Sequence, residues 1–192
     1  MIYLPGPNYA LDDFNLRDRL AQIISERKIE AVVETGLNDG QSTLAFCKIA
    51  PKVYGIDYDP ACVNCTINRL KEAGVTNGEV LLGNSPDVLR DLMPRINPSN
   101  TLFFLDAHWG GECPILEEIA AIPRDQGVLV FHDFQVPGKD FGWDHMLIKG
   151  QYFPLNYDFL RPSLIDWSPT HEIEYAKAVS ASSRGFAFVY PK

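Results

Sequence analysis

The sequence predicts an α/β protein with a mostly parallel sheet that is covered by helices on both faces. Short apolar runs alternate five times with segments of helical spacing, a rhythm that is typical of parallel strands connected by helices. The predicted strands span residues 31–34, 53–57, 79–83, 101–106 and 127–133. Because several of these runs are apolar on both faces, we expect them to be buried inside the sheet.

The predicted helices have recognisable starts and stops. Leu16, Leu20 and Ile23 follow Asp12 and Asp13 at helical spacing, and acidic residues are favoured near the positive end of a helix. Proline begins or ends helices, and glycine often ends them. The helices are expected at residues 13–28, 41–50, 60–74, 86–93 and 114–122.

The rhythm changes after residue 133. Residues 135–155 are rich in glycine, proline and aromatic residues, and no helix of normal length is predicted there. Residues 157–167 and 185–190 are predicted to be strands, with a polar connection over 168–184. No repeat or linker divides the chain, so residues 1–192 are predicted to form a single domain.

Length and composition limit the function classes. The 192 residues are 46% hydrophobic, which suffices for one sizeable core. The net charge of -8 and the pI near 4.9 oppose general attraction to nucleic acid or to an anionic membrane surface. No apolar run reaches the roughly 18 residues of a membrane span, and residues 1–7 lack the pattern of a signal peptide. A cytoplasmic location is therefore predicted.

Two of the four cysteines form a Cys-x-x-Cys motif. Cys62 and Cys65 have no second Cys/His pair at a spacing suited to a zinc site. They fall in the first turns of a predicted helix, where a thiol pKa can be lowered and a redox role is conceivable. The favoured interpretation is a pair of reduced helix cysteines, since thiols seldom pair in the cytosol.

The turn after the first strand carries the most informative motif. Gly36 and Gly40 stand four apart in Glu-x-Gly-x-x-x-Gly-x-Ser-Thr, which is neither the dinucleotide fingerprint nor a phosphate-binding loop. The motif resembles the first motif of class I S-adenosylmethionine-dependent methyltransferases, in the form found in small O-methyltransferase-like members. A tight strand-to-helix turn that binds no ligand is the alternative.

This resemblance implies a Rossmann-like methyltransferase fold, with a seven-stranded sheet and an antiparallel C-terminal strand pair. It also implies a donor site near the first turn. The residues predicted to bind S-adenosylmethionine are Glu34, Gly36, Asn38, Gly40, Ser42, Asp57, Asn84, Ser85 and Asp106.

The other predicted donor residues stand at strand ends. Asp57 ends the second strand, where a carboxylate can accept hydrogen bonds from a ribose diol, although an aspartate there can also face solvent. Asp59 is better suited to capping the helix that Pro60 begins. By the resemblance, Asn84 and Ser85 contact the adenine, while the sequence equally allows them to cap a helix.

A second group of polar residues follows the fourth and fifth strands. Asp106 and His108 follow one strand, and His132-Asp133 follow the other. Catechol-type O-methyltransferases hold a metal with an aspartate and an Asp-Asn pair at the corresponding strand ends, so His132 departs from that pattern. Asp106, His132 and Asp133 are the predicted metal ligands, with magnesium, manganese or iron as candidates and nitrogen ligation favouring the last two.

Without a metal, His108 or His132 could act as the general base, because histidine titrates near neutral pH. Asp106, His108 and His132 are therefore the predicted catalytic residues. Each histidine could also be an ordinary hydrogen-bonded side chain. The segment around Phe141 and Trp143 could fold over a substrate or simply pack down, and Trp109, Trp143 and Trp167 could wall an apolar pocket.

The sequence thus predicts methyl transfer from S-adenosylmethionine to a small molecule, most readily at oxygen. One alternative is a non-haem metal oxygenase on the same fold, as in cephalosporin-hydroxylase relatives, because one histidine with two aspartates has the composition of a facial triad. Another is a non-catalytic cofactor-binding protein. No nucleic acid or membrane partner is expected. The sequence leaves the oligomeric state open, a homodimer included.

Overall fold

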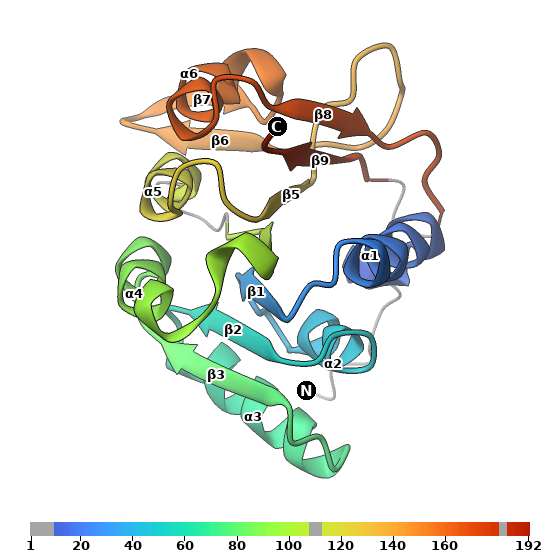
Figure 1. Cartoon of the computed structure of the whole chain (residues 1–192), viewed down its shortest axis with the longest axis vertical. Coiled ribbons are helices and arrows are strands. Elements are labelled where there is room, and N and C mark those ends of the chain that lie inside the picture. Colours follow the sequence, from blue (N-terminus) through green and yellow to red (C-terminus); the bar gives the residue numbers. More distant parts are fainter. Residues whose placement is uncertain (1–9, 108–112, 181–183) are drawn as a thin grey trace.

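A seven-stranded sheet forms the centre of the molecule. The computed structural model describes residues 10–107, 113–180 and 184–192. Its strand order is β3-β2-β1-β4-β5-β9-β8, with β9 antiparallel to both of its neighbours and the other pairs parallel (Figure 1). The strands are β1 (Ala31–Thr35), β2 (Val53–Asp57), β3 (Gly78–Leu82), β4 (Thr101–Leu105), β5 (Val128–His132), β8 (Glu172–Tyr175) and β9 (Phe186–Tyr190). The predicted architecture, with its antiparallel C-terminal pair, is confirmed.

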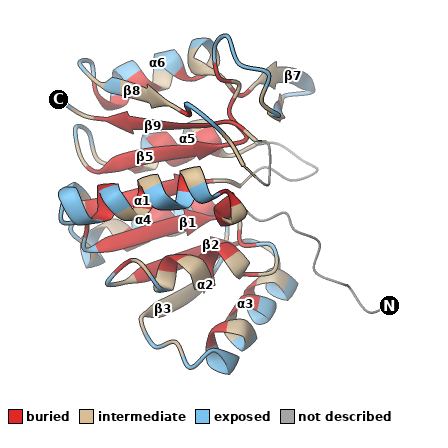
Figure 2. Cartoon of the chain, turned by 90° about the vertical axis from the view of Figure 1, so that its right-hand side faces the viewer, coloured by how far each residue is buried: buried red, intermediate tan, exposed pale blue. Residues whose placement is uncertain are grey.

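Helices cover both faces of this sheet. In Figure 2, α1 (Phe14–Glu26), α2 (Gln41–Cys47) and α3 (Pro60–Glu72) lie in front of the sheet. Behind it lie α4 (Ser85–Leu92), α5 (Ile115–Ala121) and α6 (Tyr157–Trp167). Short 3-10 helices occur at Ala10–Asp12, Met93–Arg95 and Pro98–Asn100. Among the described residues, no helix is long and apolar enough to cross a membrane.

The helix boundaries follow from local chemistry. Asp13 caps α1 by accepting hydrogen bonds from the backbone N–H groups of Asn15 and Leu16. Asp59 caps α3 by accepting from the N–H of Ala61, and Pro60 occupies the first turn as predicted. Gly74, with φ +66°, follows the C-cap of this helix and turns the chain away from the helix axis.

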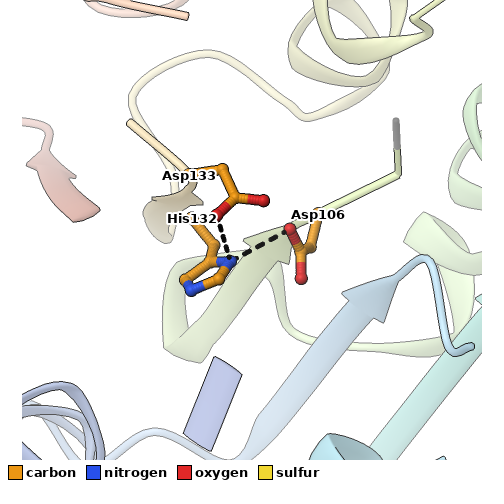
Figure 3. A group of neighbouring side chains, drawn as sticks. All are labelled: Asp106, His132 and Asp133. Atoms are coloured by element: carbon orange, nitrogen blue, oxygen red, sulfur yellow. Dashed lines mark ion pairs between the residues drawn. The ribbon is translucent and has the colours of Figure 1, made fainter. Parts of the chain in front are cut away.

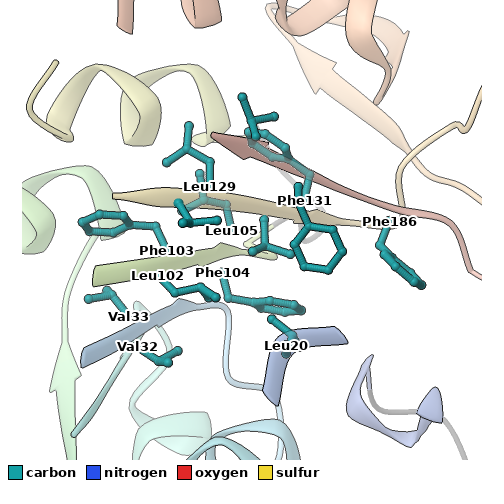
Figure 4. Packing of buried hydrophobic residues seen from close by; sticks show 14 of the residues in the cluster. Leu20, Val32, Val33, Leu102, Phe103, Phe104, Leu105, Leu129, Phe131 and Phe186 are labelled. Carbon is teal, nitrogen blue, oxygen red and sulfur yellow. The ribbon is translucent and has the colours of Figure 1, made fainter. Parts of the chain in front are cut away.

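Aromatic and aliphatic side chains from the central strands form the core. Phe103 and Phe104 of β4 and Phe131 of β5 are fully buried, and Figure 4 shows them packed among strand and helix residues. Phe46 of α2 meets Phe104 edge to face with ring centroids 5.2 Å apart. Burying a side chain of this size contributes about 2–3 kcal/mol. Of the five predicted strands, β1, β2, β4 and β5 are buried throughout, whereas β3 at the edge of the sheet is only partly buried.

One predicted strand is wrong. Residues 157–167 form helix α6, which begins when Asn156 accepts a hydrogen bond from the N–H of Phe159. Leu160, Leu164 and Trp167 are buried at helical spacing against the sheet. The strand that pairs with β9 is instead β8, which lies inside the segment predicted to be a polar connection.

Residues 135–155 contain no helix, as predicted, but they form a hairpin. Strands β6 (His145–Ile148) and β7 (Gln151–Pro154) pair antiparallel. Lys149 and Gly150 join them with positive φ values of 49° and 77°, which suit the two-residue turns of hairpins. Lysine is an unusual residue at such a position, so the turn carried no clear signal in the sequence.

Parallel pairing brings distant strand ends to one edge of the sheet. Thr35 lies opposite both Ile56 of β2 and Leu105 of β4, so Asp57 and Asp106 follow at the same edge. The predicted convergence of these two aspartates is confirmed.

Gly36 is required by a close backbone contact at this edge. Its φ is +80°, and a Cβ there would lie 2.6 Å from the carbonyl oxygen of Asp106. We predict that Gly36→Ala lowers the free energy of unfolding by about 3 kcal/mol, because it adds a clash to the strain of a positive φ.

Gly150→Ala is the matched control in urea denaturation. Gly150 has φ +77° but nothing within 4 Å of an added Cβ, so only the conformational loss of about 1 kcal/mol is expected. Equal losses in the two variants would show that the contact with Asp106 does not require the glycine.

Candidate functional site at the carboxyl edge of the sheet

The turn from Gly36 to Gly40 is held in a left-handed conformation. Gly36, Asn38 and Gly40 all have positive φ, and Asn38 is exposed. A Cβ on Gly40 would lie 2.6 Å from Oγ1 of Thr66, so this glycine lets α2 pack against α3. The turn therefore needs both glycines for contacts within the chain, and ligand contact at this turn stays a prediction.

Asp57 fixes the same turn from the end of β2. Its side chain is buried, with Oδ2 accepting from the N–H of Leu37 at 2.8 Å and Oδ1 accepting from the N–H of Asp59 at 2.9 Å. Each carboxylate oxygen can accept a further hydrogen bond. Asp57 thus joins the two loops at this edge, and its predicted contact with a ribose stays open.

Glu34 lies beneath the turn and is fully buried. Its Oε2 accepts a hydrogen bond from Oγ1 of Thr43 at 2.6 Å, which connects β1 to α2. Burial raises the pKa of Glu34 to about 8, while the hydroxyls of Ser42 and Thr43 oppose the shift. Near neutral pH Glu34 is therefore largely a neutral acid, and its first visible role is to position α2.

Asn84 and Ser85 stand at the start of α4. Asn84 occupies the N-cap position, is exposed, and donates a side-chain hydrogen bond to Oδ2 of Asp87 rather than capping the helix. Ser85 is buried. Their predicted contact with adenine is not tested by the structure.

A buried acid that sequence reasoning missed lies behind this edge. Glu118 of α5 is fully buried, and neither carboxylate oxygen has a well-formed hydrogen bond among the described residues. Burial raises the pKa of Glu118 to about 7, and the nearby hydroxyls of Ser85 and Thr35 lower it. The sequence could have indicated this burial, because Glu118 lies three residues after Ile115 and so falls on the apolar, buried face of its helix.

Asp106, His132 and Asp133 come together at the ends of β4 and β5 (Figure 3). Nδ1 of His132 lies 3.4 Å from Oδ1 of Asp106 and 3.4 Å from Oδ1 of Asp133. His132 and Asp133 are buried, and the Asp106 side chain is 20% exposed. The three residues predicted to be metal ligands are thus assembled as one cluster, which is reachable from solvent on the Asp106 side.

The two carboxylates control the charge of the imidazole. Burial alone would lower the pKa of His132, but the charge and close contact of Asp106 and the charge of Asp133 outweigh it and raise the pKa to about 9. At pH 7 the metal-free imidazole is therefore protonated. A protonated imidazole cannot accept a proton, so His132 does not fit the predicted role of general base at this pH in the metal-free protein.

The cluster has the dimensions of a metal site. Ligand atoms about 2.1 Å from a common ion lie ~3.0 Å apart at a right angle and ~3.4 Å apart at a tetrahedral angle. The ligand atoms of Asp106, His132 and Asp133 all lie within 4.8 Å of one another. The donor set of one nitrogen and carboxylate oxygens suits manganese, iron or zinc. In the described part of the chain, Nε2 of His132 lacks the hydrogen-bond partner that usually orients a ligating histidine.

Of three further residues that the sequence singled out, one lies among the residues that the structure describes. His108, predicted to be catalytic, and Trp109 lie outside the described residues. Trp167 does not wall a pocket at this edge: it is buried, and its indole N–H donates to the carbonyl oxygen of Pro123, which precedes β5. Trp167 instead lines a different pocket with Ile119 and Ile122, because its position in helix α6 places it at the opposite edge of the sheet.

The cysteines follow the simpler interpretation. All four are free thiols, and Cys62 and Cys65 lie in the first turns of α3. Burial raises the pKa of the Cys62 thiol, which makes the thiolate less available.

Solved structures share this fold at low sequence identity. An O-methyltransferase from Bacillus cereus in complex with SAH superposes with a TM-score of 0.69 at 16% identity, over 98% of this chain and 84% of that chain. The O-methyltransferase TomG from Streptomyces achromogenes, in complex with SAM, gives 0.65 at 18% identity over 98% and 83%. The chain has the class I methyltransferase fold.

This methyltransferase fold is shared by proteins with different substrates. An rRNA methylase from Streptococcus thermophilus also matches, with a TM-score of 0.56 at 13% identity over 97% of this chain and 99% of that chain. No protein-family model matches the sequence, and the search of curated proteins found no match. The resemblance inferred from the sequence motif is confirmed at the level of the fold.

The buried ionisable groups predict that stability falls as pH rises. Glu34, Glu118 and His132 all have pKa values above those of the unfolded chain, so the folded state binds more protons. A folded state that binds more protons loses stability with increasing pH, here from about pH 4.5 to about pH 9. We expect the free energy of unfolding, measured with a chelator present, to decline across this window.

Glu118→Gln isolates one contribution to this decline. The variant should remove a loss on the order of 3 kcal/mol, most of which develops between pH 5 and 8. Glu117→Gln, at the exposed neighbouring position, is the control and should leave the decline unchanged. An identical pH profile for Glu118→Gln and the wild type would contradict the assignment of Glu118 as a buried neutral acid.

Proposed function

We propose that the protein is an S-adenosylmethionine-dependent methyltransferase that acts on a small molecule, at oxygen. The observation that supports this most is the gathering of Asp57, Asp106, His132 and Asp133 at the carboxyl edge of a sheet with the methyltransferase fold. Ligands of open α/β sheets bind at that edge. The O-methyltransferases with similar structures contain SAM or SAH.

The donor would lie along the turn from Gly36 to Gly40 and the end of β2. Asp57 offers its remaining lone pairs to a ribose diol. Tyr58 comes directly after Asp57, and Leu82 lies opposite Asp57 on β3. Their side chains are 65% and 55% exposed and would provide an apolar surface for a purine ring. Neither residue was singled out from the sequence, because an exposed apolar side chain has no signature of its own.

The reaction needs alignment more than it needs an activated donor. The acceptor oxygen attacks the methyl carbon, the carbon–sulfur bond breaks, and its electron pair returns to the positively charged sulfur, leaving neutral thioether product. The acceptor's proton must leave as the oxygen attacks. Because metal-free His132 is protonated at neutral pH, its part there is to hold Asp106 and Asp133 in place by charge.

Asp106, His132 and Asp133 would hold a divalent metal ion. When bound, the ion would act as a Lewis acid that stabilises negative charge on the acceptor oxygen. The ion would also displace the imidazole proton, so metal affinity is expected to increase with pH. The buried setting of His132 and Asp133 would then keep water from the acceptor side.

A small acceptor fits the charge of the chain better than RNA does. The net charge of -8 opposes binding to a polyanion, although one protein of similar structure is an rRNA methylase. A cytoplasmic location fits a small-molecule enzyme of this kind, and a homodimer is compatible with it.

Titration with S-adenosylhomocysteine tests the donor site directly. We predict measurable heat by calorimetry and an affinity at least tenfold weaker in Asp57→Asn, because the amide keeps only one acceptor oxygen. Asp18→Asn, on the exposed face of α1 with a side chain that is 74% exposed, is the control and should bind like the wild type. No heat at millimolar ligand would defeat the proposed activity.

Metal analysis separates methyl transfer from the oxygenase alternative. One histidine with two aspartates also suits an iron oxygenase, so the same cluster motivates both functions. We predict that Mn²⁺ binds the wild type at one equivalent and that Asp106→Ala abolishes this binding. Stoichiometric iron with turnover of 2-oxoglutarate would favour the oxygenase, and unchanged Mn²⁺ binding in Asp106→Ala would remove the cluster from the mechanism.

A further inference from the structure

Arg184 lies beside the cluster although it is 51 residues further along the chain than Asp133. Its Nε lies 3.5 Å from Oδ1 of Asp133, and its Nη1 donates to Oδ1 of Asp144 at 3.1 Å. Oδ1 of Asp133 is also the atom that faces Nδ1 of His132. One carboxylate oxygen therefore lies between the imidazole and the guanidinium group.

The backbone around Arg184 is fixed by a contact that only glycine permits. The N–H of Phe134 donates to the carbonyl of Gly185 at 2.9 Å, and the N–H of Gly185 donates to the carbonyl of Gly142 at 2.8 Å. A Cβ on Gly185 would lie 2.2 Å from the carbonyl oxygen of Phe134. The start of β9 can therefore approach the end of β5 closely enough to bring Arg184 to Asp133.

The hairpin of β6 and β7 is attached at the same point. The N–H of Asp144, the residue before β6, donates to the carbonyl of Asp133 at 3.0 Å, and the N–H of Leu155, after β7, donates to the carbonyl of Asp144 at 3.0 Å. Further along, the N–H of Cys113 donates to the carbonyl of Leu147 at 3.1 Å. The hairpin is thus hydrogen-bonded through Asp144 to Asp133 and through Leu147 to Cys113, so it is attached beside the cluster.

We propose that Arg184 is a positioning residue that fixes the Asp133 carboxylate toward His132 and fastens the β6–β7 hairpin beside the cluster. The proposal rests on the proposed function in one respect, the use of Asp133 as a metal ligand. The guanidinium group is suited to this double contact, because its planar fork presents several donors in fixed directions. Asp133 itself has φ 55°, an uncommon conformation for a non-glycine residue that its neighbours must hold.

The test compares four variants. Arg184→Gln removes the charge from both contacts, Arg184→Lys keeps the charge without the fork, and Asp144→Asn weakens the attachment of the hairpin alone. Arg161→Gln, on the exposed side of α6, is the charge-matched control. Amide hydrogen exchange of residues 145–154 reports on the hairpin in metal-free protein, Mn²⁺ titration reports on Asp133, and titration with S-adenosylhomocysteine reports on the donor side.

For Arg184→Gln we expect Mn²⁺ affinity to fall 10- to 100-fold, the range for partners that orient a metal ligand. Hairpin amides should exchange at least tenfold faster, while donor affinity stays within twofold because Arg184 lies at the far side of the site. Arg184→Lys should fall between Arg184→Gln and the wild type. In Asp144→Asn the hairpin amides should exchange faster, while Mn²⁺ affinity stays within threefold of the wild type. This variant also replaces Arg184→Gln in the hairpin measurement if Arg184→Gln is too unstable to measure.

The proposal would be overturned if the hairpin amides of Arg184→Gln exchange as slowly as those of the control Arg161→Gln, whatever the metal result. Where Arg184→Gln is too unstable to measure, the same comparison is made with Asp144→Asn. Faster hairpin exchange with unchanged Mn²⁺ affinity in Arg184→Gln would overturn the positioning of Asp133. A wild type that binds no Mn²⁺ but whose hairpin depends on Arg184 supports the fastening and refutes the metal part of the proposed function. The two failures are therefore distinguishable.

Discussion

The close approach between the ends of β1 and β4 is the constraint on which the site depends. Gly36 leaves room for the carbonyl of Asp106, and the N–H of Asp106 donates to the carbonyl of Thr35 at 3.2 Å. One of these strands leads into the turn proposed to bind the donor, and the other ends at the acidic cluster. If the donor and the acceptor bind where we propose, this contact would set the distance between them. Methyl transfer benefits from such fixed geometry, because alignment of the reacting atoms supplies much of the rate.

The same edge gathers several carboxylates, and the fold stabilises them in three different ways. Glu34 and Glu118 are fully buried, and burial raises their pKa values to about 8 and about 7, which favours their protonated forms. Asp57 stays close to backbone N–H groups that satisfy its charge. Asp106 and Asp133 face the imidazole of His132. Among the described residues, this last group is the one whose carboxylate and imidazole atoms lie close enough together to hold a metal ion, which is why the proposed metal site is placed there.

The sequence predicted those features that local chemistry determines. The five βα units, the cap Asp59 and the strand ends at Asp57 and Asp106 all depend on neighbouring residues, and they were found where predicted. Helix α6 was missed because its aromatic and leucine residues also suit a strand, and the capping role of Asn156 becomes visible only once the helix exists. Arg184 was missed for a different reason: its contact with Asp133 requires the tertiary approach at Gly185. Site residues placed by sheet topology could be predicted, whereas those placed by loops and chain ends could not.

The net charge of Asp106, His132 and Asp133 differs between the metal-free and the proposed metal-bound state. Two carboxylates with a protonated imidazole carry one net negative charge, which disfavours a second anion nearby. A divalent ion with a neutral imidazole would make the site neutral overall, which would favour the approach of an acceptor oxygen that loses its proton. Arg184 shares its charge between Asp133 and Asp144, so it stabilises the carboxylates without adding net charge to this group of five residues in the metal-bound state. If a metal ion binds as proposed, the exchange of proton for metal at His132, rather than proton removal by His132, would prepare the site for an oxygen nucleophile.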